Sequence, residues 1–138
     1  MAIVINTDGG SRGNPGPAGI GAVIREDAIT LAEVSSYIGE QTNNFAEYEA
    51  LIQALEVLHE KVSERLAEVD VEIRMDSELI VKQMKGEYKV KDATLKEKNA
   101  RVHELLEKIP HAHFMHVPRE ENAEADALVN AALDNALL

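Results

Sequence analysis

The segment that most constrains the fold is a short apolar run that leads to a carboxylate and is followed by glycines and prolines. Residues 2–5, Ala-Ile-Val-Ile, predict a buried strand that carries Asp8 to the edge of a sheet. After Asp8 the chain reads Gly-Gly-Ser-Arg-Gly-Asn-Pro-Gly-Pro, which predicts a loop whose backbone can approach another molecule closely. Such a segment suits a metal or phosphate site, but taken alone it fits a solvated hairpin loop about equally well.

Composition favours one domain that covers residues 1–138. The chain is 45% apolar, which suits a single compact core. It has no cysteine, no signal-peptide pattern and no apolar run long enough to cross a membrane. We therefore expect a soluble, cytoplasmic protein without membrane association, disulfides or a cysteine-ligated zinc site.

The charge distribution predicts local recognition of any anionic partner. A net charge of −11 argues against a protein that coats nucleic acid through bulk positive charge. Half of the fourteen basic residues nevertheless fall between positions 82 and 101: Lys82, Lys85, Lys89, Lys91, Lys96, Lys98 and Arg101. Lys96 and Lys98 are interpreted as ordinary exposed lysines on a helix.

The order of elements predicts an α/β fold. Alternation and helical spacing indicate three strands, a helix, a strand, two helices, a strand and an alanine-rich helix. In this order they cover residues 2–5, 20–25, 29–38, 44–63, 71–75, 79–85, 94–109, 113–117 and the segment from 123 onward. Thr94 is expected to cap the third helix and Ser77 the second. Because strands separated by helices are usually parallel, we expect a mixed five-stranded sheet, three strands antiparallel and then two parallel, flanked by helices.

Four carboxylates stand at the ends of these elements: Asp8, Glu47, Asp76 and Asp126. Any one of them taken singly would more often be a solvated surface group. Brought to about 4 Å, each pair repels by about 4 kcal/mol at an effective dielectric near 20, so a partner must offset the charge. Oxygen ligands suit Mg²⁺ or Mn²⁺, and two such ions can flank a phosphodiester. Without ions, at least one of these carboxyl groups should have a raised pKa.

Several blocks of the sequence resemble one family. Thr7-Asp8-Gly9-Gly10-Ser11 with Gly13-Asn14-Pro15-Gly16-Pro17, then Thr42-Asn43-Asn44-Phe45-Ala46-Glu47-Tyr48, Asp76-Ser77 and Asn122-Ala123-Glu124-Ala125-Asp126 are similar to the signature blocks of type 1 ribonuclease H, in order and spacing, over essentially the whole chain. The resemblance implies the ribonuclease H fold and an endonuclease that hydrolyses the RNA strand of RNA/DNA hybrids, leaving 5′-phosphate and 3′-hydroxyl ends. It also implies that Asp8, Glu47, Asp76 and Asp126 are catalytic metal ligands for Mg²⁺, with Mn²⁺ as a substitute and two ions with substrate bound.

The same resemblance implies substrate-binding residues. Asn14, Thr42 and Asn43 match positions that contact the substrate, and Gly10 with Arg12 would line the groove that holds the RNA strand. The chain departs from many members at Arg119, which stands where they carry a loop histidine, and we interpret Arg119 as a phosphate contact. It also resembles a short form of the family that lacks the basic protrusion, a basic helix and loop with which some members grip the hybrid. Only residues 87–93 stand in its place here, and Lys89 and Lys91 are expected to bind the hybrid instead.

Two alternatives of other classes remain. One is a catalytically silent hybrid-binding module, and the other is a nuclease of the same fold that acts on DNA junctions or ends. The glycine loop lacks the Gly-Lys-Ser/Thr ending of a P-loop, so no nucleotide cofactor is expected, and we expect a monomer. His111, His113 and His116 are interpreted as surface residues, since His116 would lie on the opposite strand face from the other two.

Overall fold

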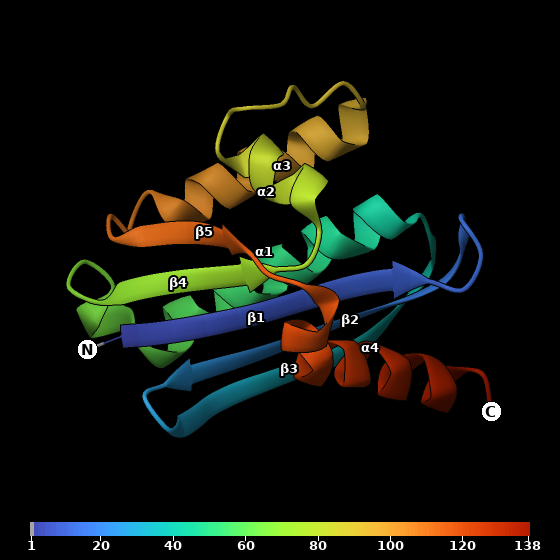
Figure 1. The fold of residues 1–138 in the computed structure, drawn as a ribbon, viewed down its shortest axis with the longest axis horizontal. Helices are drawn as coiled ribbons and strands as arrows, with labels where there is room; N and C mark the ends of the chain where they lie inside the picture. Colours follow the sequence, from blue (N-terminus) through green and yellow to red (C-terminus); the bar gives the residue numbers. More distant parts are fainter. Residues whose placement is uncertain (1) are drawn as a thin grey trace.

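The computed structural model describes residues 2–138 and contains one five-stranded sheet with four helices (Figure 1). In chain order the elements are β1 (Ala2–Ser11), β2 (Gly16–Glu26), β3 (Ile29–Gln41), α1 (Asn43–Lys61), β4 (Asp70–Met75), α2 (Glu78–Met84), α3 (Ala93–Leu106), β5 (Ala112–His116) and α4 (Ala123–Ala136). Single 3₁₀ turns lie at Ser63–Arg65 and Arg119–Asn122. Within residues 2–138, none of the helices is both long and apolar enough to span a lipid bilayer.

The sheet has the predicted topology, with strand order β3-β2-β1-β4-β5. β1 pairs antiparallel with β2, and β2 with β3, whereas β1 pairs parallel with β4, and β4 with β5. The expectation of three antiparallel strands followed by two parallel ones is therefore confirmed. Because β1 and β4 run in the same direction, with Thr7 opposite Met75, the next residues of the two segments, Asp8 and Asp76, lie side by side.

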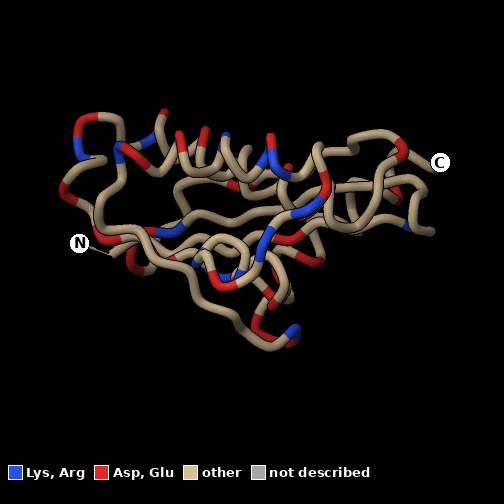
Figure 2. The backbone as a smooth tube through the Cα atoms, turned by 90° about the horizontal axis from the view of Figure 1, so that it is seen from above, with Lys and Arg blue, Asp and Glu red and all other residues tan. Residues whose placement is uncertain are grey.

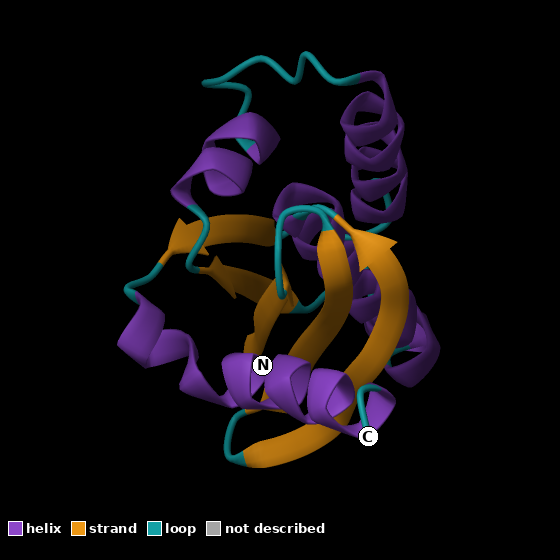
Figure 3. Cartoon of the chain, turned by 90° about the vertical axis from the view of Figure 1, so that its right-hand side faces the viewer, coloured by secondary structure: helices purple, strands orange, loops and turns teal. Residues whose placement is uncertain are grey.

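Helices cover both faces of the sheet. Gly9 faces the backbone of α1 at Ala46, whereas Gly21, which pairs with Asp8 on β1, faces α4 at Ala125. Since successive residues of a strand point to opposite faces, α1 and α4 lie on opposite sides of the sheet (Figure 3). The main core fills the side of α1, where Ile3, Ile5 and Ile73 of the strands pack against Leu51 and Leu55 of the helix.

The glycine-rich segment is more regular than its composition suggests. We expected Gly9 and Gly10 to lie in a loop, but β1 continues to Ser11, with Gly9 opposite Ile20 and Gly10 opposite Gly19. Pairing with β2 satisfies the backbone at these positions, and the turn is confined to residues 12–15. The prediction of a loop directly after Asp8 was therefore wrong.

Of the two predicted helix caps, Ser77 is confirmed and Thr94 is wrong. Thr42 Oγ1 accepts a hydrogen bond from Phe45 N at 3.2 Å, and Ser77 caps α2 in the same way. The expected cap Thr94 lies inside α3, which begins two residues earlier because Asp92 Oδ1 accepts from Leu95 N at 2.9 Å. Asp and Thr both cap helices well, so the spacing of apolar residues did not distinguish the two positions.

Candidate metal and nucleic-acid site

Three carboxylates meet where the parallel pairing between β1 and β4 ends. Asp8 lies on β1, Asp76 follows β4 directly, and Glu47 comes from the start of α1. One oxygen from each of them lies within 4.8 Å of the others. Asp126, near the start of α4, lies beside Asp8, and all four line one pocket of about 410 Å³. The predicted convergence of the four side chains is thus found in the structure.

Close packing around β1 brings these groups together. A Cβ atom on Gly9 would lie only 2.3 Å from Ala46 O and 2.6 Å from Glu47 N, so the absence of a side chain lets α1 rest directly against the strand. On the other side of the sheet, Asn122 Nδ2 donates to Thr7 O at 2.8 Å and Asn6 Nδ2 donates to Asn122 Oδ1 at 3.1 Å. Asn122 therefore ties the entry of α4 to the residue before Asp8.

Sequence reasoning missed this role of Asn122. The residue precedes α4 and has the composition of a helix cap, but its side chain makes no cap hydrogen bond and bonds to β1 instead. It is only 1% exposed. A buried amide that satisfies a backbone carbonyl across 115 positions of sequence leaves no local signal in the chain.

Burial and mutual repulsion raise the proton affinity of the cluster. Burial raises the pKa of Asp8 to about 8, with further contributions from the charges of Asp76 and Glu47 and from the hydrogen bond with Asp126. Burial also raises the pKa of Glu47 to about 7, although a hydrogen bond from Ser77 lowers it. These directions agree with the expectation of a raised pKa in a metal-free cluster.

The donor set fits a hard divalent cation. It consists of carboxylate oxygens alone, which suit Mg²⁺ or Mn²⁺ better than Zn²⁺. A cation would also oppose the raised pKa values, because it favours the charged form of each carboxyl group. Asp8, Glu47 and Asp76 are the residues that would hold it, with Asp126 beside them.

The raised pKa of Asp8 predicts that the metal-free protein loses stability as pH rises. Below about pH 4, Asp8 is protonated in both the folded and the unfolded chain. Between pH 4 and 8 it stays protonated only in the folded chain, so the free energy of unfolding falls as pH rises. In chelator at pH 8.5, Asp8→Asn should therefore raise the free energy of unfolding by about 2 kcal/mol or more, and by much less at pH 4.5. Urea unfolding at both pH values measures the difference.

The matched control is Asp70→Asn, which changes an exposed carboxylate at the start of β4. It should follow the wild-type chain at both pH values. A difference between Asp8→Asn and wild type that does not grow with pH would contradict the assignment of a raised pKa to this carboxyl group.

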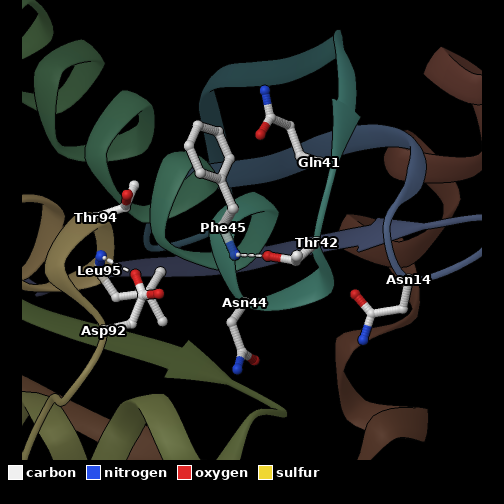
Figure 4. A pocket seen from close by; sticks show the side chains of 8 residues that line it. All are labelled: Asn14, Gln41, Thr42, Asn44, Phe45, Asp92, Thr94 and Leu95. Atoms are coloured by element: carbon white, nitrogen blue, oxygen red, sulfur yellow. Dashed lines mark hydrogen bonds between the residues drawn. The ribbon is translucent and has the colours of Figure 1, made fainter.

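A second pocket of about 570 Å³ adjoins the carboxylates, between the starts of α1 and α3 (Figure 4). Its lining is mostly neutral and polar, and consists of Asn14, Gln41, Thr42, Asn44, Phe45, Asp92, Thr94 and Leu95. Asn43, on the rim of the carboxylate pocket, links the two regions: its Oδ1 accepts from Ser11 N at 2.8 Å, and its N donates to Asn14 Oδ1 at 3.0 Å. The two pockets therefore both border the start of α1, and we refer to them together as the groove.

Of the other five predicted contact residues, two line the carboxylate pocket and three line neither pocket. Gly10 and Arg119 line the pocket of the carboxylates. Arg12 lines neither pocket, and its guanidinium pairs with Asp134 of α4 at 2.7 Å. Lys89 and Lys91 are exposed in the connection between α2 and α3, which contains no helix among the described residues, and neither residue lines the two pockets. His113 and His116 face Glu72 and Glu78 respectively, so they do not converge.

Lys98 differs from its prediction. We interpreted it as an ordinary exposed lysine, but its side chain is only 15% exposed and its ammonium lies 2.7 Å from Glu49 Oε1. The same ammonium lies 3.9 Å from the centroid of the Phe45 ring. Helical spacing places position 98 beside the inward-facing residues of α3, but it does not reveal that Glu49 and Phe45 of α1 lie opposite this position.

Comparison with known proteins identifies the family. Residues 6–132 match the family model described as reverse transcriptase-like. The chain is 59% identical to LC11-RNase H1, isolated from compost, with a TM-score of 0.93 and 99% of both chains covered, and that protein has also been solved in complex with an RNA/DNA hybrid. It is 41% identical to the N-terminal RNase H domain of a bifunctional protein from Mycobacterium tuberculosis, with a TM-score of 0.88, 97% of this chain and 100% of that chain covered.

A third relative is ribonuclease HI of Halobacterium salinarum, which is 45% identical over 94% of this chain. The chain spans 63% of the length of that protein and 36% of the length of the full mycobacterial one. The fold, the order of the motifs and these similarities together lead to one conclusion: the chain belongs to the type 1 ribonuclease H family, within the reverse transcriptase-like group.

Proposed function

We propose that residues 1–138 form one ribonuclease H domain that hydrolyses the RNA strand of RNA/DNA hybrids, as a monomer, with Asp8, Glu47, Asp76 and Asp126 as its catalytic carboxylates. The observation that carries the proposal is the cluster of three carboxylate oxygens within 4.8 Å beside an open polar groove. The relative that is 59% identical has been solved with an RNA/DNA hybrid, which supports the choice of substrate. The complete carboxylate set argues against a silent binding module.

The proposed reaction is attack of water on a phosphodiester of the RNA strand, with cleavage of the bond to the 3′ oxygen and release of 5′-phosphate and 3′-hydroxyl ends. Two Mg²⁺ ions, or Mn²⁺ in their place, supply activation of the water and stabilisation of the leaving oxygen when bound. The chain's part is to hold four carboxylates at fixed positions. The close approach of α1 to β1 at Gly9 and the hydrogen bond from Asn122 to Thr7 O hold these carboxylates together despite their repulsion.

Neutral and basic side chains around the cluster are proposed to hold the hybrid. Gly10, Arg12 and Arg119 are proposed to contact the strand that is cut, and Asn14, Thr42 and Asn43 the backbone or bases of the substrate. All of them except Arg12 line one of the two pockets. Acidic and basic positions are interspersed along the backbone (Figure 2), so attraction must be local. Contacts to the backbone give affinity without sequence specificity, and 2′-hydroxyls distinguish the RNA strand.

Lys89 and Lys91 are proposed to add phosphate contacts from the connection between α2 and α3. Replacing both with methionine should raise KM and reduce the slope of log KM against log salt concentration by about one for each lost contact. Steady-state cleavage at four salt concentrations measures the slope. The control replaces Lys61 and Lys108 near the opposite ends of α1 and α3, which removes the same charge far from the groove. Equal slopes for the two double variants would show that Lys89 and Lys91 do not contact phosphates.

The experiment that tests the function compares four substrates in Mg²⁺: an RNA/DNA hybrid, duplex DNA, duplex RNA and a four-way DNA junction. The proposal expects cutting of the hybrid alone, in its RNA strand. Cutting of the junction or of DNA ends would favour a nuclease of the same fold with another substrate. Binding of the hybrid without cutting, in either metal, would favour the silent module.

A further inference from the structure

The strongest unexplained feature outside the carboxylate cluster is the half-buried ammonium of Lys98. Lys98 Nζ on α3 is bound between two groups of α1: Glu49 Oε1 at 2.7 Å and the ring of Phe45 at 3.9 Å from its centroid. The Glu49 carboxylate also accepts from Gln53 Nε2 at 2.9 Å, which holds it in place. Removing an ammonium from water is costly, and a carboxylate together with an aromatic face offsets that cost.

Phe45 connects this arrangement to the groove. Its backbone N–H is fixed by the Thr42 cap at 3.2 Å, and its ring lines the larger pocket (Figure 4). In that view the ring stands with Gln41 on one side and with Thr94 and Leu95 on the other. Phe45 is the only aromatic residue in the lining of that pocket within the described chain, and it lies two positions before Glu47.

Lys98 itself is not placed to bind the substrate. Its charge is already paired with Glu49, and its side chain is 15% exposed, whereas Lys96 on the same helix is exposed. The ring of Phe45, in contrast, is half-buried and borders open space. An aromatic surface at such a position can pack against a sugar or a base of a bound strand without regard to sequence.

We propose that Lys98 is a positioning residue for nucleic-acid binding: held by Glu49, it fixes the ring of Phe45 as an apolar contact surface of the groove. This inference rests on the proposed function and adds to it a contact through which α3, by way of Phe45 on α1, affects the groove. Loss of the ammonium frees the ring, so the substrate must order it on binding, and affinity falls while the carboxylates are untouched.

The first test is a comparison of KM and kcat for charge-removing variants. Lys98→Met keeps the length of the side chain and should raise KM for the hybrid by about three- to tenfold, with kcat within about twofold of wild type. Phe45→Leu should have a similar effect, and the double variant should be no worse than either single one, because both remove the same contact. Lys98→Arg should restore KM, since a guanidinium can pair with Glu49 and stack on the ring.

The second test separates positioning from general electrostatics. Lys96→Met removes the same charge two positions away and should change KM by less than about twofold. Glu49→Met makes the chain less negative, which by charge alone would tighten binding of an anionic substrate, but positioning predicts weaker binding because Lys98 is released. Its control is Glu97→Met, an exposed carboxylate on α3. Tighter binding by Glu49→Met, or equal KM values for Lys98→Met and Lys96→Met, would overturn the inference.

A third measurement does not depend on substrate. In the wild-type chain, the ε-methylene protons of Lys98 should show upfield NMR shifts from the Phe45 ring, and these shifts should disappear in Phe45→Leu. Absent shifts would overturn the inference even if the hybrid is cut. Failure of the wild-type chain to bind or cut the hybrid, with the shifts present, would instead refute the proposed function and with it the role assigned to this contact.

Discussion

Asp8→Asn and Asp76→Asn should each reduce cleavage of an RNA/DNA hybrid by about a thousandfold or more, because each removes a charged ligand worth about 4 kcal/mol or more of transition-state stabilisation. Both residues directly follow the last parallel pair of β1 and β4, and their oxygens lie within 4.8 Å of that of Glu47. The change from carboxylate to amide preserves shape, so the loss measures charge and ligation. Single-turnover cleavage in saturating Mg²⁺ gives the rate of the chemical step.

The variants must remain folded for this result to be meaningful. Since burial and repulsion raise the pKa of Asp8, neutral Asn should leave the metal-free protein at least as stable as wild type. Hybrid binding in Ca²⁺ or chelator should also persist. Asp70→Asn, which alters an exposed carboxylate on β4, should cleave normally. Residual activity above about a tenth of wild type in either active-site variant would show that the cluster is not the catalytic centre.

Gly9→Ala should destabilise the protein by about 3 kcal/mol or more, the upper end of the usual cost of overpacking. The added Cβ would lie 2.3 Å from Ala46 O, 2.4 Å from Ala46 C and 2.6 Å from Glu47 N. All three are backbone atoms of α1, which cannot move aside as a flexible side chain can. The helix must shift away from β1, which also displaces Glu47 from the other carboxylates.

The neighbouring glycine provides a matched control. A Cβ on Gly10 would meet only Asn43 Oδ1, at 3.9 Å, so Gly10→Ala should change the free energy of unfolding by less than about 1 kcal/mol. Both residues lie in β1 and pair with β2, so intrinsic strand propensity is the same for the two changes. Urea unfolding monitored by circular dichroism compares them. Equal destabilisation would show that contact between β1 and α1 is not what requires Gly9.

Most of the fold could be predicted because local patterns and topology agree. Alternating apolar strands and helices with clear caps give the element order, and the preference for parallel pairing across helices gives the sheet. The four carboxylates followed from their positions at element ends, since strands that run in parallel present their ends at one edge. These features depend on periodicity and spacing, which a single sequence contains.

The errors arise where a contact between distant segments decides the structure. Gly9 and Gly10 continue a strand because β2 pairs with them, although their composition favours a loop. Asn122 bonds to Thr7 rather than to its own helix, and Lys98 is drawn in by Glu49 and Phe45 on α1. In each case the partner lies far away in sequence, so the residue type alone predicts the commoner surface or loop role.

The most direct test of the proposed function is cleavage of a hybrid labelled at the 5′ end of the RNA strand, with a separate label on the DNA strand, by the wild-type chain. The account predicts cutting of the RNA strand alone, in Mg²⁺ or Mn²⁺, with 3′-hydroxyl ends on the labelled fragments and no cutting in chelator. Cutting of both strands, or cutting that persists in chelator, would contradict a metal-dependent ribonuclease H centred on Asp8, Glu47, Asp76 and Asp126.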